Sequence, residues 1–416
     1  MSRIPVLLIV LLSGSVRLSG ARPSPRGDER VSAPSLTILA IGDAGETGSA
    51  LRGNAGIMTD MFTGRHDGGK FQALLFLGDN FYNTGLNVPA PEVEGKVKSI
   101  LGPFKDVFDG LGRVNVHAIP GNHDYYRRNA LEASILFGLV SVAEAPVGIS
   151  SRGNEREAAI EWWSYHYSLP AQVTLPIGGE SRDSVQFIFF DSALPLRTDP
   201  KSWRPALDSL SRLLAASRER RGIVWRIFAA HHPFSSVGEH GGYSVWDDEL
   251  NRVDYLPNCD RDSNAVAWIK NWLDPQDLCT ERYKQYLDSV GTILRAGGVR
   301  IQAALSGHEH SLQLLYRPDR TGDDLSPAVQ IISGAGSKPA RVKFPAPPFE
   351  FTSAQSAPDK EGVSLPGFVQ LSFRDNRMRI VFFNAKTGDP IDMGGGREEF
   401  WVDPEGRLIE PDTHHD

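Results

Sequence analysis

Cysteine, excess positive charge and long apolar runs are all scarce in this 416-residue chain. Its only cysteines, Cys259 and Cys279, are too few for a disulfide scaffold, and either one local disulfide or two unpaired thiols would fit them. The formal net charge of -7 argues against nucleic-acid binding by phosphate neutralisation. No apolar run approaches the roughly 20 residues of a membrane span. What remains is a globular protein, and its 40% hydrophobic residues can bury a large core.

The N-terminus has the layout of a secretory signal peptide. The apolar run Ile4–Leu12 follows a basic start and precedes small residues that end at Ala21. We therefore predict a secreted protein, released outside the cell or into a periplasm. The predicted divisions are a signal peptide at 1–21, a flexible lead-in at 22–34, a folded domain at 35–393 and a C-terminal tail at 394–416.

Segments of strand length alternate with helix-like segments along the folded part. Runs rich in β-branched and aromatic residues occur at Leu36–Ile41, Ala73–Leu77, Val114–Ile119, Val185–Phe190, Ile223–Ala229, Ile301–Leu305, Val329–Ile332, Phe368–Phe373 and Met378–Phe383. The helix-like segments are Asn54–Phe62, Glu92–Phe108, Trp203–Ser217 and Glu281–Ala296. This alternation predicts a layered α/β domain.

Five short polar blocks follow these apolar runs, at the places where the chain would leave a strand. They are Gly42–Gly45, Gly78–Tyr82, Gly121–Asp124, Ala230–Pro233 and Gly307–His310. One such block would fit a turn or a helix cap equally well, whereas five in this order indicate a site at the strand ends of an α/β sheet. Their carboxylates, imidazoles, amide and phenol suit iron, zinc or manganese. Two such ions can clamp a phosphate, and one carboxylate must then bridge them.

The five blocks resemble those of the calcineurin-like metallophosphoesterases, and in particular the small, tartrate-resistant type of purple acid phosphatase. The resemblance runs from about Leu36 to Ile391, and its most specific element is the block that ends at Tyr82. Further support comes from Gly238–Gly241 and Ser333–Gly336. The resemblance implies two packed mixed β-sheets flanked by helices.

The resemblance also implies a role for each polar side chain. Asp43, Tyr82 and His310 would bind a ferric ion, Asp79 would bridge, and Asn122, His231 and His308 would bind a second ion, which is iron, zinc or manganese. His123 and His240 would face the substrate, with Asp124 as an orienting partner of His123. The other histidines, among them His117 and His166, are expected to be structural or solvated rather than catalytic.

Two features depart from the family pattern. His232 stands where the family often has tyrosine, and it is expected to line the pocket. The stretch between His231 and His308 is longer than in compact members, which we interpret as an insertion at about 242–290 that contains both cysteines. Both departures concern substrate preference rather than the reaction itself.

The resulting prediction is a secreted acid phosphatase that hydrolyses phosphate monoesters, small or protein-borne, by metal-bound hydroxide at a dinuclear centre. A phosphodiesterase or nucleotidase on the same scaffold is a second hypothesis. A secreted metal-binding protein without turnover is a third, and His123 argues against it. The sequence gives no indication of the oligomeric state.

Overall fold

The structure is a computed structural model. The residues that it describes are 36–83, 85–86, 90–125, 162–178, 182–238, 240–241, 243–247, 252–256, 276–278, 280–316, 327–343, 361–394 and 396–410. The predicted signal peptide, the lead-in, Cys259 and Cys279 lie outside these residues, so those expectations stay predictions. Within the described ranges, no helix combines the length and the apolar character that crossing a membrane requires.

A mixed sheet of eight strands carries the first three polar blocks. Its strand order is β18-β17-β16-β15-β1-β2-β3-β4. Strands β1 to β4 are parallel, whereas β15 pairs antiparallel with β1 and leads into a series of antiparallel strands. The bounds are β1 (Leu36–Ile41), β2 (Ala73–Phe76), β3 (Val116–Ala118), β4 (Ser164–Tyr165), β15 (Gly367–Arg374), β16 (Arg377–Asn384), β17 (Glu399–Val402) and β18 (Leu408–Ile409).

A second mixed sheet of six strands carries the other two blocks. Its order is β11-β12-β10-β7-β6-β5, with parallel pairing from β6 through β7 and β10 to β12 and antiparallel strands at both edges. The bounds are β5 (Ala171–Pro176), β6 (Ser184–Phe190), β7 (Ile223–Ala230), β10 (Ala303–Ser306), β11 (Leu312–Tyr316) and β12 (Val329–Ser333).

Two small antiparallel pairs complete the described strands. They are β8 (Tyr243–Asp247) with β9 (Arg252–Leu256), and β13 (Arg341–Lys343) with β14 (Glu361–Val363). The first pair lies within the predicted insertion. The end of that predicted segment belongs instead to a helix that packs on the second sheet.

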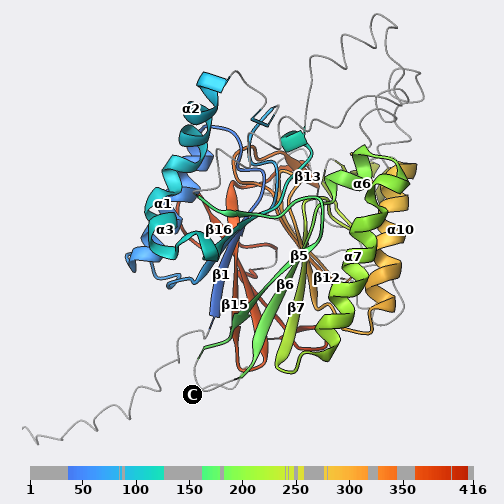
Figure 1. The fold of residues 1–416 in the computed structure, drawn as a ribbon. Coiled ribbons are helices and arrows are strands. Elements are labelled where there is room, and N and C mark those ends of the chain that lie inside the picture. Colours follow the sequence, from blue (N-terminus) through green and yellow to red (C-terminus); the bar gives the residue numbers. More distant parts are fainter. Residues whose placement is uncertain are drawn as a thin grey trace, which may run out of the picture. The chain divides into compact units, whose positions relative to one another are not determined.

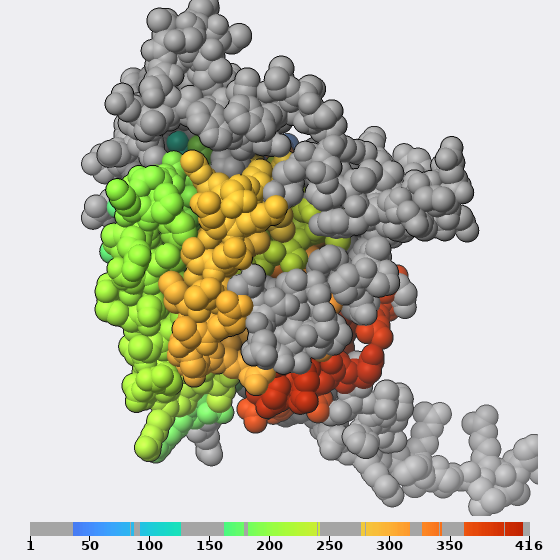
Figure 2. Space-filling view, turned by 90° about the vertical axis from the view of Figure 1, so that its right-hand side faces the viewer, coloured from blue at the N-terminus to red at the C-terminus, as the bar shows by residue number. Residues whose placement is uncertain are grey.

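Helices cover the outer face of each sheet (Figure 1). On the first sheet these are α1 (Ser49–Thr63), α2 (Ala90–Leu101), η1 (Gly102–Phe104) and α3 (Lys105–Leu111). On the second sheet they are α6 (Ala193–Arg197), α7 (Pro200–Glu219) and α10 (Glu281–Ala296). Figure 2 shows α7 and α10 side by side on the outside of the molecule. The short 3-10 turns are η2 (Arg113–Asn115) and η3 (His123–Tyr125).

Strand β1 shows why the central strands are continuous apolar runs in the sequence. Ile38 and Ala40 face the core between the sheets, together with Phe187 and Leu305 of the second sheet. The alternate residues of β1 face helix α1, where Leu39 packs in the same cluster as the helix side chains. Parallel strands covered on both faces need apolar residues at every position, so the alternation of half-exposed strands is missing. The predicted fold, two packed mixed sheets flanked by helices, is confirmed.

Two sequence expectations need correction. The predicted helix Glu92–Phe108 is divided into α2, η1 and α3, because Pro103 lacks the N–H that a continuous helix requires. The predicted tail at 394–416 contains β17 and β18, which extend the first sheet. In β17 only Phe400 and Val402 are buried, and this short alternation between charged neighbours is a weak strand signal.

Candidate metal centre

The polar blocks of both sheets meet where their parallel strands end. The loop after β1 bonds to the other sheet through Gly42 N and Ser333 O at 2.6 Å, and Asp43 N donates to Gly78 O at 2.9 Å. Within the second sheet, Gly307 N donates to His231 O at 3.1 Å. These backbone bonds fix the loops that carry the predicted ligands. Side chains from widely separated parts of the sequence are thereby brought together.

Several of these residues have a backbone conformation that non-glycine residues seldom adopt. Asp43 (φ 56°), Asp79 (φ 51°), His308 (φ 72°) and His310 (φ 29°) are four of the seven described non-glycine residues with positive φ. Such conformations cost about 1–2 kcal/mol for an L-residue. They persist where the surrounding structure imposes them, which is common at functional sites. In this protein they turn the side chain inward at the end of a strand.

The first group of donors is formed by Asp43, Tyr82 and His310. The Tyr82 hydroxyl donates to Asp43 Oδ1 at 2.8 Å and lies 2.8 Å from His310 Nε2. His310 Nε2 is 3.4 Å from Asp43 Oδ1. The other oxygen of Asp43 accepts a bond from the backbone N–H of His308 at 2.7 Å. That bond orients the carboxylate so that Oδ1 faces the phenol and the imidazole.

The second group is formed by Asn122, His231 and His308. His231 Nε2 lies 3.0 Å from Asn122 Oδ1, while its Nδ1 is bonded to the backbone oxygen of Leu77 at 2.7 Å. His308 Nε2 lies 3.1 Å from the backbone oxygen of Gln276. A carbonyl can only accept, so each imidazole donates from that nitrogen and leaves its other nitrogen as the ligand atom. Metal-binding histidines are typically oriented in this way.

Asp79 connects the two groups. One carboxylate oxygen of Asp79 lies within 4.8 Å of the ligand atoms of Asp43 and His310. Asp79 Oδ2 is 3.5 Å from His231 Nε2. Asp79 Oδ1 also accepts the backbone N–H of His123 at 2.8 Å. Burial by itself raises the pKa of Asp79, but the charges of His231 and His123 outweigh it and hold that pKa well below its usual range. A carboxylate that stays ionised between two donor groups has the place of a bridging ligand.

The donor set fits a pair of cations. Asp43 and Asp79 are 0% and 1% exposed, and buried carboxylates need a compensating positive charge. Burial and the two carboxylates raise the pKa of Tyr82 well above its usual value. In these surroundings the phenol ionises only against a strongly charged cation. Oxygen and imidazole donors, without a thiolate, are those that iron, zinc and manganese accept.

His123 lies beside both groups on the short turn η3. Its Nε2 is 4.0 Å from Asp79 Oδ2, its ring centroid is 4.6 Å from that of Tyr82, and Nδ1 is bonded to the backbone oxygen of Asn83 at 2.8 Å. The predicted orienting role of Asp124 is wrong. The Asp124 carboxylate is buried and accepts N–H bonds from Asn80, Phe81 and Gly121, which fixes the backbone around Asp79.

His240 reaches the same place from the loop after β7. Its ring stacks on that of His308 with centroids 4.3 Å apart and an interplanar angle of 25°. The His240 backbone N–H donates to Glu309 Oε2 at 3.1 Å, and its Nδ1 is bonded to Asp277 Oδ1 at 2.8 Å. The structure therefore brings all nine predicted site residues into one region at the ends of the strands.

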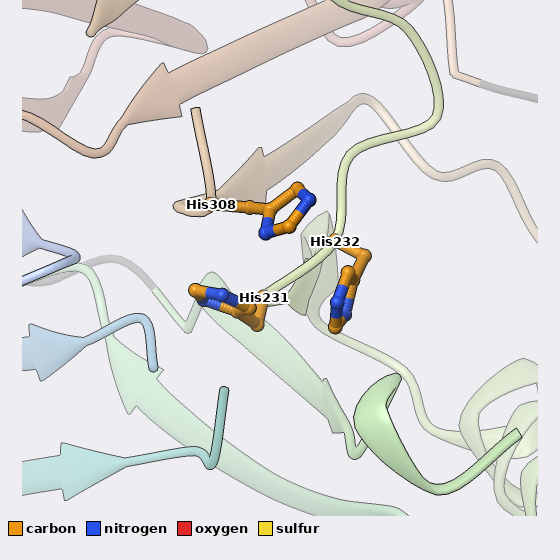
Figure 3. Close-up of side chains that lie close together, drawn as sticks. All are labelled: His231, His232 and His308. Carbon is orange, nitrogen blue, oxygen red and sulfur yellow. The ribbon is translucent and has the colours of Figure 1, made fainter. Parts of the chain in front are cut away.

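His232 is buried behind His308 and does not line an open pocket. It is 1% exposed, and its ring centroid is 4.5 Å from that of His308. Figure 3 shows the rings of His231 and His232 pointing to different sides of the segment that carries them. Although ligand atoms of His231, His232 and His308 lie within 4.8 Å of one another, His232 Nδ1 is bonded to Ser192 Oγ at 2.8 Å. The His232 ring packs against the ligand candidate His308, and its Nε2 has no hydrogen-bond partner among the described residues.

Sequence reasoning missed several residues that hold the site. Asp277 and Gln276 bond to imidazole nitrogens of the site, and Glu309 accepts the backbone N–H of His240. Lys338 lies 4.2 Å from the centroid of the Tyr82 ring and pairs with Glu46 at 2.6 Å. Glu309 could have been suspected, because it stands between two ligands, whereas the others lie outside any strand-end block.

An α/β sandwich with candidate metal ligands gathered at the carboxyl ends of its strands is the architecture of a metallophosphoesterase. The sequence profile of the calcineurin-like phosphoesterases matches residues 36–312, and the chain belongs to this family. The family hydrolyses phosphoesters and typically binds a dinuclear metal centre.

Two solved structures match this chain over most of its length. One is GAP50, the anchor in the inner membrane complex of Plasmodium, with 14% identity over 85% of this chain and 86% of that one, at a TM-score of 0.49. The other is PhoD, with 11% identity over 91% of this chain and 72% of PhoD, at a TM-score of 0.50. No curated protein sequence matches the chain. Identities this low concern the fold alone.

Proposed function

We propose that this protein is a secreted acid phosphatase of the purple, tartrate-resistant type, which hydrolyses phosphate monoesters at an iron-containing dinuclear centre. The observation that carries the proposal is the position of Tyr82. Its hydroxyl lies 2.8 Å from both Asp43 Oδ1 and His310 Nε2, in surroundings that disfavour a phenolate unless a strongly charged cation is bound. A ferric ion meets that condition.

The proposed ligands divide into two sets around a shared carboxylate. Asp43, Tyr82 and His310 would hold the ferric ion, Asn122, His231 and His308 would hold iron, zinc or manganese, and Asp79 would belong to both sets. When bound, such a pair supplies Lewis-acid polarisation of the phosphate and acidifies water enough to give a nucleophile at acid pH.

The chain itself contributes positioning and proton transfer. His123 is held by a bond between its Nδ1 and Asn83 O, which leaves Nε2 as the nitrogen toward Asp79. We assign to His123 the hydrogen bond to the substrate phosphate and the proton given to the departing alkoxide. The loops are fixed by the backbone bonds between the sheets, so the site needs little rearrangement to bind phosphate.

The test is to express the mature chain, measure its metal content and visible absorbance, and assay an aryl phosphate at acid pH. We expect iron, a tyrosinate charge-transfer band that Tyr82→Phe abolishes, and hydrolysis of the monoester. A band that survives Tyr82→Phe would refute the ferric assignment. A rate on a diester that exceeds the rate on the monoester would favour a phosphodiesterase.

Secretion is part of the proposal and rests on the layout of residues 1–21. N-terminal sequencing of the exported protein tests it. We expect the mature chain to begin near Arg22, and an uncleaved protein retained inside the cell would contradict export.

A further inference from the structure

A three-residue segment outside the family's polar blocks contacts two histidines of the site. Asp277 Oδ1 is 2.8 Å from His240 Nδ1, and the backbone oxygen of Gln276 is 3.1 Å from His308 Nε2. We call residues 276–278 the clamp segment. The two imidazoles that it contacts stack on each other with centroids 4.3 Å apart. One short piece of chain therefore orients a pair of neighbouring rings.

The clamp segment is fixed by bonds to the peptide group between Asp277 and Leu278. Leu278 N donates to the backbone oxygen of His240 at 3.0 Å. The backbone N–H and the hydroxyl of Thr280 both donate to the backbone oxygen of Asp277, at 3.0 Å and 2.9 Å. The Asp277 side chain thus starts from a backbone position that is tied directly to His240.

Helix α10 holds the clamp segment against the second sheet. Thr280 is the N-cap of this helix and accepts from the backbone N–H of Tyr283 at 3.4 Å. Tyr283 is completely buried, and its hydroxyl donates to the backbone oxygen of Pro233 at 2.6 Å. Pro233 lies two residues after His231, so the clamp segment and the ligand loop share one rigid support.

The carboxylate of Asp277 restrains the rotation of the His240 side chain. The backbone of His240 is fixed through Glu309 and Leu278, but these two bonds do not set the orientation of the imidazole. A carboxylate accepts a hydrogen bond from Nδ1–H and thereby sets both the ring orientation and the tautomer. The side chains of His240 and Asp277 are 26% and 17% exposed, so the pair lies at the edge of the site, where substrate can reach the imidazole.

We propose that Asp277 is a positioning residue, which holds His240 on the face of His308 so that His240 Nε2 meets the phosphate of the substrate. This inference rests on the proposed function, because it assigns phosphate contact to His240. Its physical content is a hydrogen bond that restrains the orientation of the His240 ring, comparable to the outer partners of metal-binding histidines. Asp277 lies in the stretch between His231 and His308, outside the polar blocks that follow the strands.

A double-mutant cycle tests whether Asp277 acts through His240. The variants are Asp277→Ala, His240→Ala and the double variant, each loaded with metal. The measurements are kcat and KM for an aryl phosphate, the Kd of inorganic phosphate by calorimetry, and metal content. We expect Asp277→Ala to lower kcat/KM and to weaken phosphate binding, each by about 10- to 100-fold, at unchanged metal content. In the His240→Ala background, Asp277→Ala should have no further effect.

Two further variants separate positioning from a merely structural role. Asp277→Asn keeps an acceptor oxygen for Nδ1–H and should recover most of the loss seen with Asp277→Ala. Asp288→Ala removes an exposed carboxylate from α10 and should match the unmodified protein in both kcat/KM and phosphate binding. If Asp277→Ala does not fold, Asp277→Ser replaces it in the cycle, because serine suits the turn before a helix and is too short to reach the imidazole.

Independent effects of the two single variants would overturn the proposal, and so would a phosphate Kd unchanged by Asp277→Ala. Failure of the proposed function looks different. An unmodified protein that binds phosphate but hydrolyses no monoester would refute the phosphatase assignment, while the cycle measured on phosphate Kd would still decide whether Asp277 positions His240.

Discussion

Gly121→Ala tests whether Asp79 is the residue on which both metal-binding groups depend. Gly121 packs directly against Asp79, and an added Cβ would lie 2.1 Å from Asp79 Oδ1 and 2.3 Å from the Asp79 backbone nitrogen. Ordinary contact begins at 3.4 Å, so the carboxylate would have to move by about 1.3 Å. The same oxygen accepts the backbone N–H of His123, so that bond is lost as well.

The expected magnitudes follow from the size of this displacement. Overpacking of this kind costs about 1–3 kcal/mol of unfolding free energy. A misplacement of about 1 Å at a catalytic group lowers the rate by on the order of 100-fold. We therefore expect Gly121→Ala to lower kcat by about that factor and to reduce the bound metal, both relative to the unmodified protein. Urea unfolding, elemental analysis and an aryl phosphate assay measure the three quantities.

Gly56→Ala is the matched control. Gly56 is exposed within α1, and a Cβ added there meets nothing within 4 Å. Alanine is the better helix former, so this variant should gain about 0.5–1 kcal/mol and keep its metal and its activity. If Gly121→Ala retained full metal content and full activity, the bridging role of Asp79 would be refuted.

Three other perturbations test the buried carboxylates of the metal site, the buried histidines and the core between the sheets. Removing metal with a chelator should lower the unfolding free energy by about 4 kcal/mol relative to protein held at a metal concentration 1,000-fold above the metal Kd. The reason is that Asp43 and Asp79 lose their compensating cations. A melting curve that does not respond to the chelator would contradict this prediction. Burial lowers the pKa of both His117 and His166 to about 4 from 6.5. Between pH 4 and pH 6.5 the unfolded chain therefore binds more protons than the folded protein. The unfolding free energy should fall as the pH falls from about 6.5 to 4. His166→Phe should remove about half of that fall in urea titrations at several pH values, since each histidine contributes one proton. Leu305→Ala should cost about 2–5 kcal/mol in urea unfolding because the side chain is completely buried between the sheets, and an effect below about 1 kcal/mol would contradict its place in that core.

Much of the fold could be predicted because its central strands are buried on both faces. Runs such as Leu36–Ile41 and Val185–Phe190 are apolar throughout most of their length, and their bounds agree closely with β1 and β6. The prediction of helices and strands failed where a proline or charged neighbours interrupted the hydrophobic pattern. Pro103 divides a predicted helix, and β17 lies between charged residues where only Phe400 and Val402 mark the buried face.

The sequence predicted which residues form the candidate site, and the structure places them in one region; the bonds that hold their side chains could not be predicted. Asp43, Asp79 and His308 follow apolar strands in blocks that resemble a known family, so their identity can be inferred from the order of motifs. The hydrogen-bond partners of the histidines could not be inferred from motifs. The carbonyls of Leu77 and Gln276 are backbone atoms, and nothing in the identity of a residue indicates which imidazole its carbonyl will meet.

The sequence by itself determined the layered fold and the set of candidate metal ligands, because hydrophobic patterning and motif order are properties of the linear chain. Only the tertiary structure decided how those side chains are held. The inward turn of Asp43 at φ 56°, the contact of Gly121 with Asp79 and the bond between Asp277 and His240 all depend on segments that meet only after the two sheets have packed. Orientation at this site is a property of packing between distant segments, because each histidine takes its tautomer and its ring position from a partner that is remote in the chain.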